Sequence, residues 1–287
     1  MKRLVINADD FGLSSGTNTA VIRAWQEGVL TSASLMVTGA ACEEAIALAK
    51  DNPGLQVGLH LTLVQGRAIL GHRGFPALTD HEGNFPNDPV MAGMRMFFLK
   101  PLHRQIKAEI EGQIEKFLAT GLPLTHLDGH LNIHLHPTVF AVLCSLMPKY
   151  GINTFRLSRE RLATDLRIAP ARMIGKIVDA VIFNSLAKRA LPELERRRIS
   201  HAVEVKGLLN SGAMTEDYLL KALDHLQEGL TEIYLHPGCL PDPEIGKRMP
   251  EYRHEEELAA LLSTRVREKI RSLGIILVNY KGEVKDV

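Results

Sequence analysis

The chain has 287 residues, of which 45% are hydrophobic, so it can bury a sizeable core as one large domain or two ordinary ones. Its 34 Lys and Arg residues nearly balance 33 Asp and Glu residues, so the composition gives no electrostatic footprint for nucleic acid. Three cysteines, Cys42, Cys144 and Cys239, are odd in number and far apart, which suits neither a disulfide framework nor a zinc finger and favours a reducing cytoplasm.

The N-terminal stretch MKRLVINADD turns acidic after a short apolar run, and no apolar run reaches about 18 residues, so neither a signal peptide nor a membrane span is expected. Runs rich in Val, Ile and Leu predict eight strands, at residues 3–8, 32–37, 55–61, 123–128, 153–157, 202–206, 231–235 and 275–278. Helical patterns lie between them, at residues 16–28, 41–50, 103–119, 137–149, 170–190, 215–227 and 254–272. This alternation predicts an α/β fold, a distorted (β/α) barrel of seven to eight parallel strands, formed by one domain over residues 1–287.

One segment interrupts the alternation. Residues 64–100 are rich in glycine and proline, which predicts a long loop between the third strand and the helix that follows it. Loops of this length are usually functional, so we expect a cover or lid over a site.

Polar side chains gather at the C-terminal ends of four predicted strands. The clusters, in chain order, are Asp9 with Asp10; His60; His126 with Asp128 and His130; and His236. In parallel α/β barrels these strand ends form one rim, where active sites are built. A carboxylate with two imidazoles suits a borderline divalent ion. We therefore predict a metal site of Asp10, His60 and His130, with Asp9 free to accept a proton from water.

These assignments have structural alternatives. Asp9 or Asp10 could instead cap the helix that follows them. His60 lies within the apolar run VGLHLTL, where a histidine is commonly a satisfied core residue. His134 is four residues after His130, so the two could share one metal if a helix begins there, and His134 is the main rival ligand.

Two further side chains lie near the same rim. Arg156, at the end of the fifth predicted strand, would orient Asp9 or a substrate oxygen, or else form a surface salt bridge. Cys239 follows His236 by three residues, but no base and orienting group accompany it, so a thiol nucleophile is not predicted. Because adjacent residues of a regular strand face opposite sides, Asp9 and Asp10 can share a site only where the strand loses its regularity.

The motifs NADDFG, GLHLTL, HLDGHLNIHLHP and EIYLHPG, in this order, resemble those of the YdjC-like carbohydrate deacetylases over essentially the full chain. The resemblance implies a distorted barrel that binds one divalent ion, Mg²⁺ or Zn²⁺, and removes acetyl groups from N-acetylated amino sugars. It implies metal ligands at Asp10, His60 and His130, a catalytic base at Asp9 and a proton donor at His236.

The stretch GLLNSGAMTEDYLLKALDHL, followed by GLTEIYLHPG, is further similar to the subgroup associated with hopanoid biosynthesis, which implies the N-acetylglucosaminyl head group of a hopanoid lipid as substrate. Soluble chito-oligosaccharides are the alternative substrate. A metal phosphoesterase and an inactive sugar-binding protein are the alternative functions.

A basic segment from Arg156 to Arg198 holds 11 Lys or Arg against 5 Asp or Glu. Apolar residues within it follow helical spacing: Met173, Ile174, Ile177, Val178, Val181 and Leu186. Such a helix would pack on the barrel, form a homodimer contact, or rest on an anionic membrane as a peripheral contact. We expect a cytoplasmic protein with no nucleic-acid partner.

Overall fold

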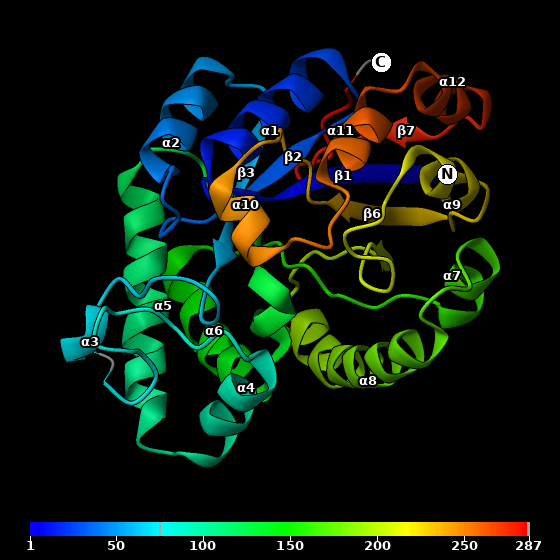
Figure 1. The fold of residues 1–287 in the computed structure, drawn as a ribbon. Helices are drawn as coiled ribbons and strands as arrows, with labels where there is room; N and C mark the ends of the chain where they lie inside the picture. Colours follow the sequence, from blue (N-terminus) through cyan, green and yellow to red (C-terminus); the bar gives the residue numbers. More distant parts are fainter. Residues whose placement is uncertain (75, 286–287) are drawn as a thin grey trace.

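The computed structural model describes residues 1–74 and 76–285. In this part of the chain, seven parallel strands form one sheet in the order β4-β3-β2-β1-β6-β5, with β7 also paired to β1. Their bounds are β1 Lys2–Phe11, β2 Ser32–Leu35, β3 Gln56–Leu61, β4 Leu127–Gly129, β5 Glu204–Lys206, β6 Gly229–Leu235 and β7 Ile276–Leu277. The sheet curls into an open, distorted barrel (Figure 1), so the predicted fold class is confirmed.

Helices surround the sheet, with α1, α2, α11 and α12 on one side and α4, α6 and α8 on the other (Figure 1). Their bounds are α1 Ser15–Glu27, α2 Cys42–Asp51, α3 Gly71–Gly74, α4 Pro89–Phe98, α5 Leu102–Ala119, α6 Pro137–Tyr150, α7 Leu162–Ile168, α8 Met173–Arg196, α9 Glu216–Asp224, α10 Pro243–Arg248, α11 His254–Leu262 and α12 Thr264–Ser272. A short 3₁₀ element, η1, spans His130–Leu135. None of the described helices is long and apolar enough to cross a membrane.

The central strand β1 loses its regularity where the two acidic residues lie. It pairs with β6 from Lys2 to Ala8, but its register against β2 shifts between Ala8 and Phe11. Asp10 has φ 62°, a left-handed conformation that non-glycine residues adopt rarely. This bulge breaks the alternation of the strand and lets Asp9 and Asp10 face the same site.

One predicted strand and one predicted loop were wrong. Residues 153–157 form no strand, because isolated bridges, Leu127 to Phe155 and Thr154 to Ser200, replace a continuous ladder. Residues 64–100 are not one loop but contain α3 and α4, and the segment buries Phe85 against the core.

The helix predicted over 254–272 is two helices. Ser263 has an extended conformation, with φ −64° and ψ 125°, which ends α11. Its hydroxyl accepts a hydrogen bond from the Val266 amide, so the same residue caps α12.

The predicted apolar face of α8 does not pack on the barrel along its first half. The helix is buried through Ala180, Ala187, Ala190 and Leu194. The residues at the predicted spacing from Met173 to Val181 are exposed instead, and this half packs through Lys176 and Ala180. The helix is therefore packed, but the predicted apolar residues do not form its packed face in this half.

Candidate metal centre and active site

Asp10 lies between two imidazoles at the C-terminal ends of β1, β3 and β4. Its Oδ1 atom is 3.3 Å from His60 Nε2 and 2.9 Å from His130 Nδ1, and all three side chains are buried. Their ligand atoms lie within 4.8 Å of one another. Asp10 Oδ2 is buried without a hydrogen-bond partner among the residues that the structure describes. An unpartnered carboxylate oxygen beside two imidazole nitrogens fits a divalent cation, so these residues could hold the predicted metal.

Asp128 orients His60 within this group. The carboxylate Oδ1 lies 2.8 Å from His60 Nδ1, which leaves Nε2 directed at Asp10. A carboxylate behind a histidine is the usual arrangement around protein metal sites, because it fixes the ring and strengthens its free nitrogen as a ligand. Burial alone would lower the pKa of His60, but the charges of Asp128 and Asp9 raise it to about 10. A cation that binds here therefore replaces a proton on His60.

Asp10 itself is strongly acidic. Burial opposes its ionisation, but His130 and His60 hold its pKa well below the usual value. The carboxylate is therefore charged across the neutral pH range, as a metal ligand must be.

His134 is directed away from this group. Its Nε2 lies 2.9 Å from the backbone oxygen of Arg156, and its ring packs edge-on against Phe155. Two residues between the histidines, Leu131 and Asn132, have φ values of 51° and 56°. No regular helix therefore begins at His130, and the spacing argument for a shared metal does not apply.

Neither acidic residue caps α1, so the capping alternative is wrong. The cap is Ser14, whose hydroxyl accepts a hydrogen bond from the Thr17 amide at 3.2 Å. Both carboxylates are thus left for the site.

Arg156 is buried, with 1% of its surface exposed, and binds three carboxylates. Its Nη1 and Nη2 atoms donate to the two oxygens of Asp9, each at 2.7 Å. Nη2 also lies 2.7 Å from Asp128 Oδ2, and Nε donates to Glu232 at 2.6 Å. The guanidinium also stacks over the Tyr234 ring at 4.4 Å. The structure thus places Arg156 against Asp9, which is one of the two arrangements predicted for it. The alternative, a surface salt bridge, is wrong.

Polar neighbours support these acids, and two of them, Ser34 and Glu232, were assigned no role from the sequence. Asn7 donates to Asp9 Oδ1 at 2.8 Å, and Ser34 donates to Asp128 Oδ2 at 2.7 Å. Glu232 was also missed, although a charged residue within the apolar run of β6 is a signal that could have indicated a buried ion pair.

His126 fills the barrel interior beside the site rather than joining the metal group. Its Nε2 lies 3.0 Å from Ser34 Oγ, and its ring stacks on Tyr280 with centroids 3.9 Å apart. Burial lowers the pKa of His126 to about 4, so the ring is neutral at neutral pH. A Cβ atom on Gly58 would lie 2.4 Å from this ring. Glycine is therefore required at this position of β3 to make room for His126.

His236 follows β6 and is held by its backbone. Its amide donates to Glu257 at 2.6 Å, and its carbonyl oxygen accepts from His254 at 2.7 Å. The ring stands edge-on to Tyr234 and Tyr252, and within residues 1–74 and 76–285 its buried Nδ1 has no hydrogen-bond partner. Burial lowers the pKa of His236, against the opposing charges of the two acidic residues on β1.

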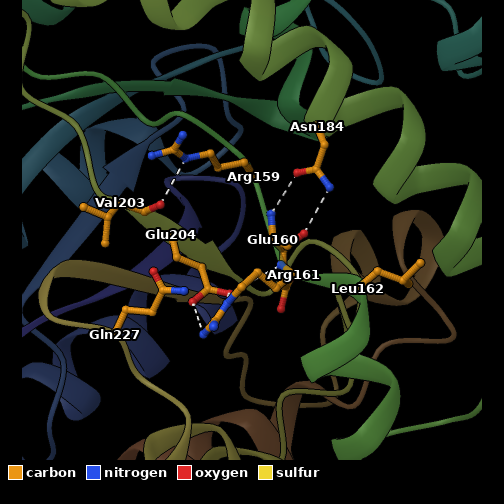
Figure 2. Close-up of a pocket in the computed structure, with 8 residues that line it drawn as sticks. All are labelled: Arg159, Glu160, Arg161, Leu162, Asn184, Val203, Glu204 and Gln227. Carbon is orange, nitrogen blue, oxygen red and sulfur yellow. Dashed lines mark hydrogen bonds and ion pairs between the residues drawn. The ribbon is translucent and has the colours of Figure 1, made fainter.

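Another pocket, shown in Figure 2, contains none of the predicted site residues. Arg161 pairs with Glu204 there at 3.0 Å, and the Asn184 amide bonds to the backbone of Glu160. The side chain of Glu160 accepts from the Leu209 amide at 3.0 Å, and burial raises its pKa to about 7. Arg161 and Glu204 neutralise each other here, whereas Arg159 donates to the Val203 backbone oxygen.

The fold and the site define an α/β-barrel protein with a buried group that could hold a metal ion at the C-terminal ends of its strands. The chain belongs to the YdjC-like protein family, whose model matches residues 3–272. It is 30% identical to a carbohydrate deacetylase of Geobacillus stearothermophilus over 96% of both chains. It is also 30% identical to one of Clostridium beijerinckii, over 97% of this chain and 99% of that relative.

A third relative, a carbohydrate deacetylase of Brevibacillus brevis, is 38% identical, and that match spans 52% of this chain and 57% of the relative. Among solved structures, a protein of Enterococcus faecalis V583 to which cellobiose-phosphate cleavage has been ascribed has a similar fold. Its TM-score is 0.76 at 26% identity, with 99% of both chains covered.

Proposed function

We propose that this protein is a metal-dependent N-deacetylase that hydrolyses the acetamido group of an N-acetylglucosamine-type amino sugar. The observation that carries the proposal is the buried group of Asp10, His60 and His130 beside Asp9, whose carboxylate is held by Arg156. Two relatives named carbohydrate deacetylases, alike to this chain over nearly its full length, support the same activity here.

The proposed ligands are Asp10, His60 and His130, and the proposed ion is Zn²⁺ or Mg²⁺. Two imidazoles favour zinc, because magnesium prefers oxygen ligands. A bound ion would supply Lewis acidity at the acetyl carbonyl and make water more acidic.

Asp9 is the proposed general base. Its Oδ1 accepts from both Asn7 and Arg156, whereas Oδ2 accepts from Arg156 alone among the described residues. A carboxylate oxygen has two lone pairs, so Oδ2 keeps one for the proton of the attacking water. The two bonds from Arg156 hold the plane of the carboxylate in one orientation.

His236 is the proposed general acid. As water oxygen adds to the carbonyl carbon and the C–N bond breaks, the departing sugar nitrogen needs a proton, and acetate and a free amine result. Burial lowers the pKa of His236, so its imidazolium is a stronger acid than that of a free histidine. Its Nδ1 has no hydrogen-bond partner among the described residues, so this nitrogen is available to carry the proton.

The finer substrate that we propose is the N-acetylglucosaminyl head group of a hopanoid lipid. Similarity of the segment from Gly207 to Leu226 to the hopanoid-associated subgroup supports it. The exposed apolar residues of α8 also support a substrate that has a lipid part.

The test is mass spectrometry of substrates incubated with the metal-reconstituted protein. We expect acetate release from N-acetylglucosaminyl lipid and, more slowly, from soluble N-acetylated chito-oligosaccharides. Phosphate release from sugar phosphates would favour a phosphoesterase, and binding without turnover would favour a sugar-binding protein; either result would overturn the proposal.

Variants assign the roles. Asp9→Asn should lose turnover while metal content stays, and near-normal turnover would remove Asp9 as the base. Asp10→Ala and His60→Ala should lose the metal. His134→Gln is the matched control, because glutamine can still donate to the Arg156 carbonyl and the variant should keep its metal. If His134→Gln lost the metal and His130→Ala retained it, His134 would be the ligand in place of His130.

A further inference from the structure

Two helices carry most of the exposed large apolar side chains of this protein. Among the described residues, 12 of the 19 exposed large hydrophobic residues lie on α4 with its C-cap or on the first half of α8. They are Val90, Met91, Met94, Phe97, Phe98 and Leu99, and Met173, Ile174, Ile177, Val178, Val181 and Ile182. We call these twelve residues the α4–α8 surface.

Each helix presents its exposed residues as a stripe. On α8 they recur at intervals of three and four residues, from Met173 to Ile182, and Ile174 is 78% exposed. On α4 the buried side is Ala92 and Met96, while Phe98 is 68% exposed. In most helices of globular proteins the apolar stripe faces the core, but here it faces outward. Such a stripe exposes apolar area to water unless another surface covers it.

The two helices that carry the stripes lie near the element that begins with His130. Both helices pack against α6, and α8 also contacts η1, the element that begins with His130. The backbone of α4 accepts a hydrogen bond at Met96 from Thr138, near the start of α6. In Figure 1, α4 and α8 lie along the same lower side of the molecule. Thus α8 contacts the element that carries the proposed ligand His130, and α4 lies one helix away from it, across α6.

Basic residues outnumber acidic residues along the chain next to both stripes, although the N-cap of α4 is the acidic residue Asp88. Between Arg95 and Lys107 there are four Lys or Arg residues and no acidic residue. Between Arg167 and Arg189 there are four exposed Lys or Arg residues and one acidic residue, Asp179, while a fifth cation, Lys176, is buried in an ion pair with Asp165. Apolar stripes edged with positive charge match the two parts of an anionic lipid surface, its acyl region and its head groups.

We propose that the α4–α8 surface docks this protein on an anionic lipid bilayer, with the candidate active site held next to the head groups. This inference rests on the proposed function, because docking on a bilayer would bring the site to a lipid-linked substrate. Apolar side chains would enter the interface, and the surrounding Lys and Arg residues would attract anionic head groups.

The test is co-sedimentation of the full chain with vesicles of phosphatidylcholine, with and without phosphatidylglycerol. We expect binding to the anionic vesicles that weakens as salt is raised. The double variants Phe97→Ser with Phe98→Ser, and Ile174→Ser with Val178→Ser, should each reduce partitioning at least about tenfold. Arg167→Glu with Arg172→Glu should reduce binding to anionic vesicles by a similar factor.

Matched controls come from other exposed positions. Leu118, 41% exposed on α5, tests an apolar loss outside the surface, and Lys50 on α2 tests a charge reversal far from it. Leu118→Ser and Lys50→Glu should bind vesicles as the unmodified protein does. No binding of the unmodified protein, or equal loss in the control variants, would overturn the proposal.

Two additional readouts separate the outcomes. If sedimentation velocity shows a homodimer that the Phe97 and Phe98 variant dissociates, the surface is a subunit interface and bilayer docking is wrong. The α4 and α8 variants should retain turnover of a soluble acetylated chito-oligosaccharide while losing that of a vesicle-embedded substrate. If the unmodified protein releases no acetate from either but still binds vesicles, the proposed function fails and the docking surface stands.

Discussion

Replacing Arg156 by lysine is expected to destabilise the fold by about 3–5 kcal/mol, the usual cost of breaking a buried ion pair. The guanidinium reaches Asp9, Asp128 and Glu232 at 2.6–2.7 Å because its donors spread around a planar fork. A lysine ammonium places its three donors at one point and cannot serve carboxylates on different edges of that fork. At least one buried carboxylate would then be left without a cation.

The assay is urea unfolding at neutral pH, followed by circular dichroism. Arg265→Lys is the control, because Arg265 pairs with Glu216 at 2.6 Å on the surface and its side chain is 68% exposed. Exposed pairs contribute little, so the control should change the free energy of unfolding by less than about 1 kcal/mol. An Arg156→Lys value as small as that of the control would refute the reasoning.

The same variant separates the support of the base from the metal site. Arg156 contacts none of Asp10, His60 and His130 directly. At urea concentrations below its unfolding midpoint, the Arg156→Lys variant should therefore keep a metal content near that of the unmodified protein. Its deacetylation rate should fall, because the orientation of Asp9 is lost. Loss of metal in the folded variant would show that the two functions cannot be separated at Arg156.

Three further predictions concern buried groups. Burial raises the pKa of Glu160 from 4.5 to about 7, so this residue costs up to about 3 kcal/mol of stability as pH rises from about 4.5 to above 7. Glu160→Gln does not ionise and should lose less stability between pH 5 and pH 8 in urea titrations; equal losses would contradict the assignment. Gly58→Ala should cost about 1–3 kcal/mol because its Cβ would overlap the His126 ring. Its combination with His126→Ala should show a smaller cost than the sum of the two, and strict additivity would argue against the clash. Asp128→Asn should weaken metal binding about 10–100-fold in calorimetric titrations, because the bond that orients His60 is weakened. Unchanged affinity would leave Asp128 without that role.

The alternation of strands and helices was enough to predict the barrel. Each pair of parallel strands needs a crossover helix, and strands and helices each have a characteristic hydrophobic periodicity in the sequence. The strand-end positions of Asp10, His60 and His130 were enough to bring these residues together in prediction, because parallel strands share one rim. The structure places the three side chains in one group.

What could not be predicted depends on long-range packing. The left-handed conformation of Leu131 and Asn132, which separates His130 from His134, follows no local propensity. Ser263 carried a capping signal, but one apolar period on both sides of it favoured a single helix. The segment around Arg156 has the apolar composition of a strand, yet its backbone makes only isolated bridges, and side-chain ion pairs hold it instead.

That last feature limits how the protein can change. Asp9 on β1, Asp128 on β4 and Glu232 on β6 all converge on Arg156, so the same few atoms join three strands and support the proposed base. A substitution that retuned this centre would reduce stability before any new activity could be selected. Evolution towards other acylated substrates is therefore expected to act on the outer elements, such as α4 and α10, while the charged centre stays unaltered.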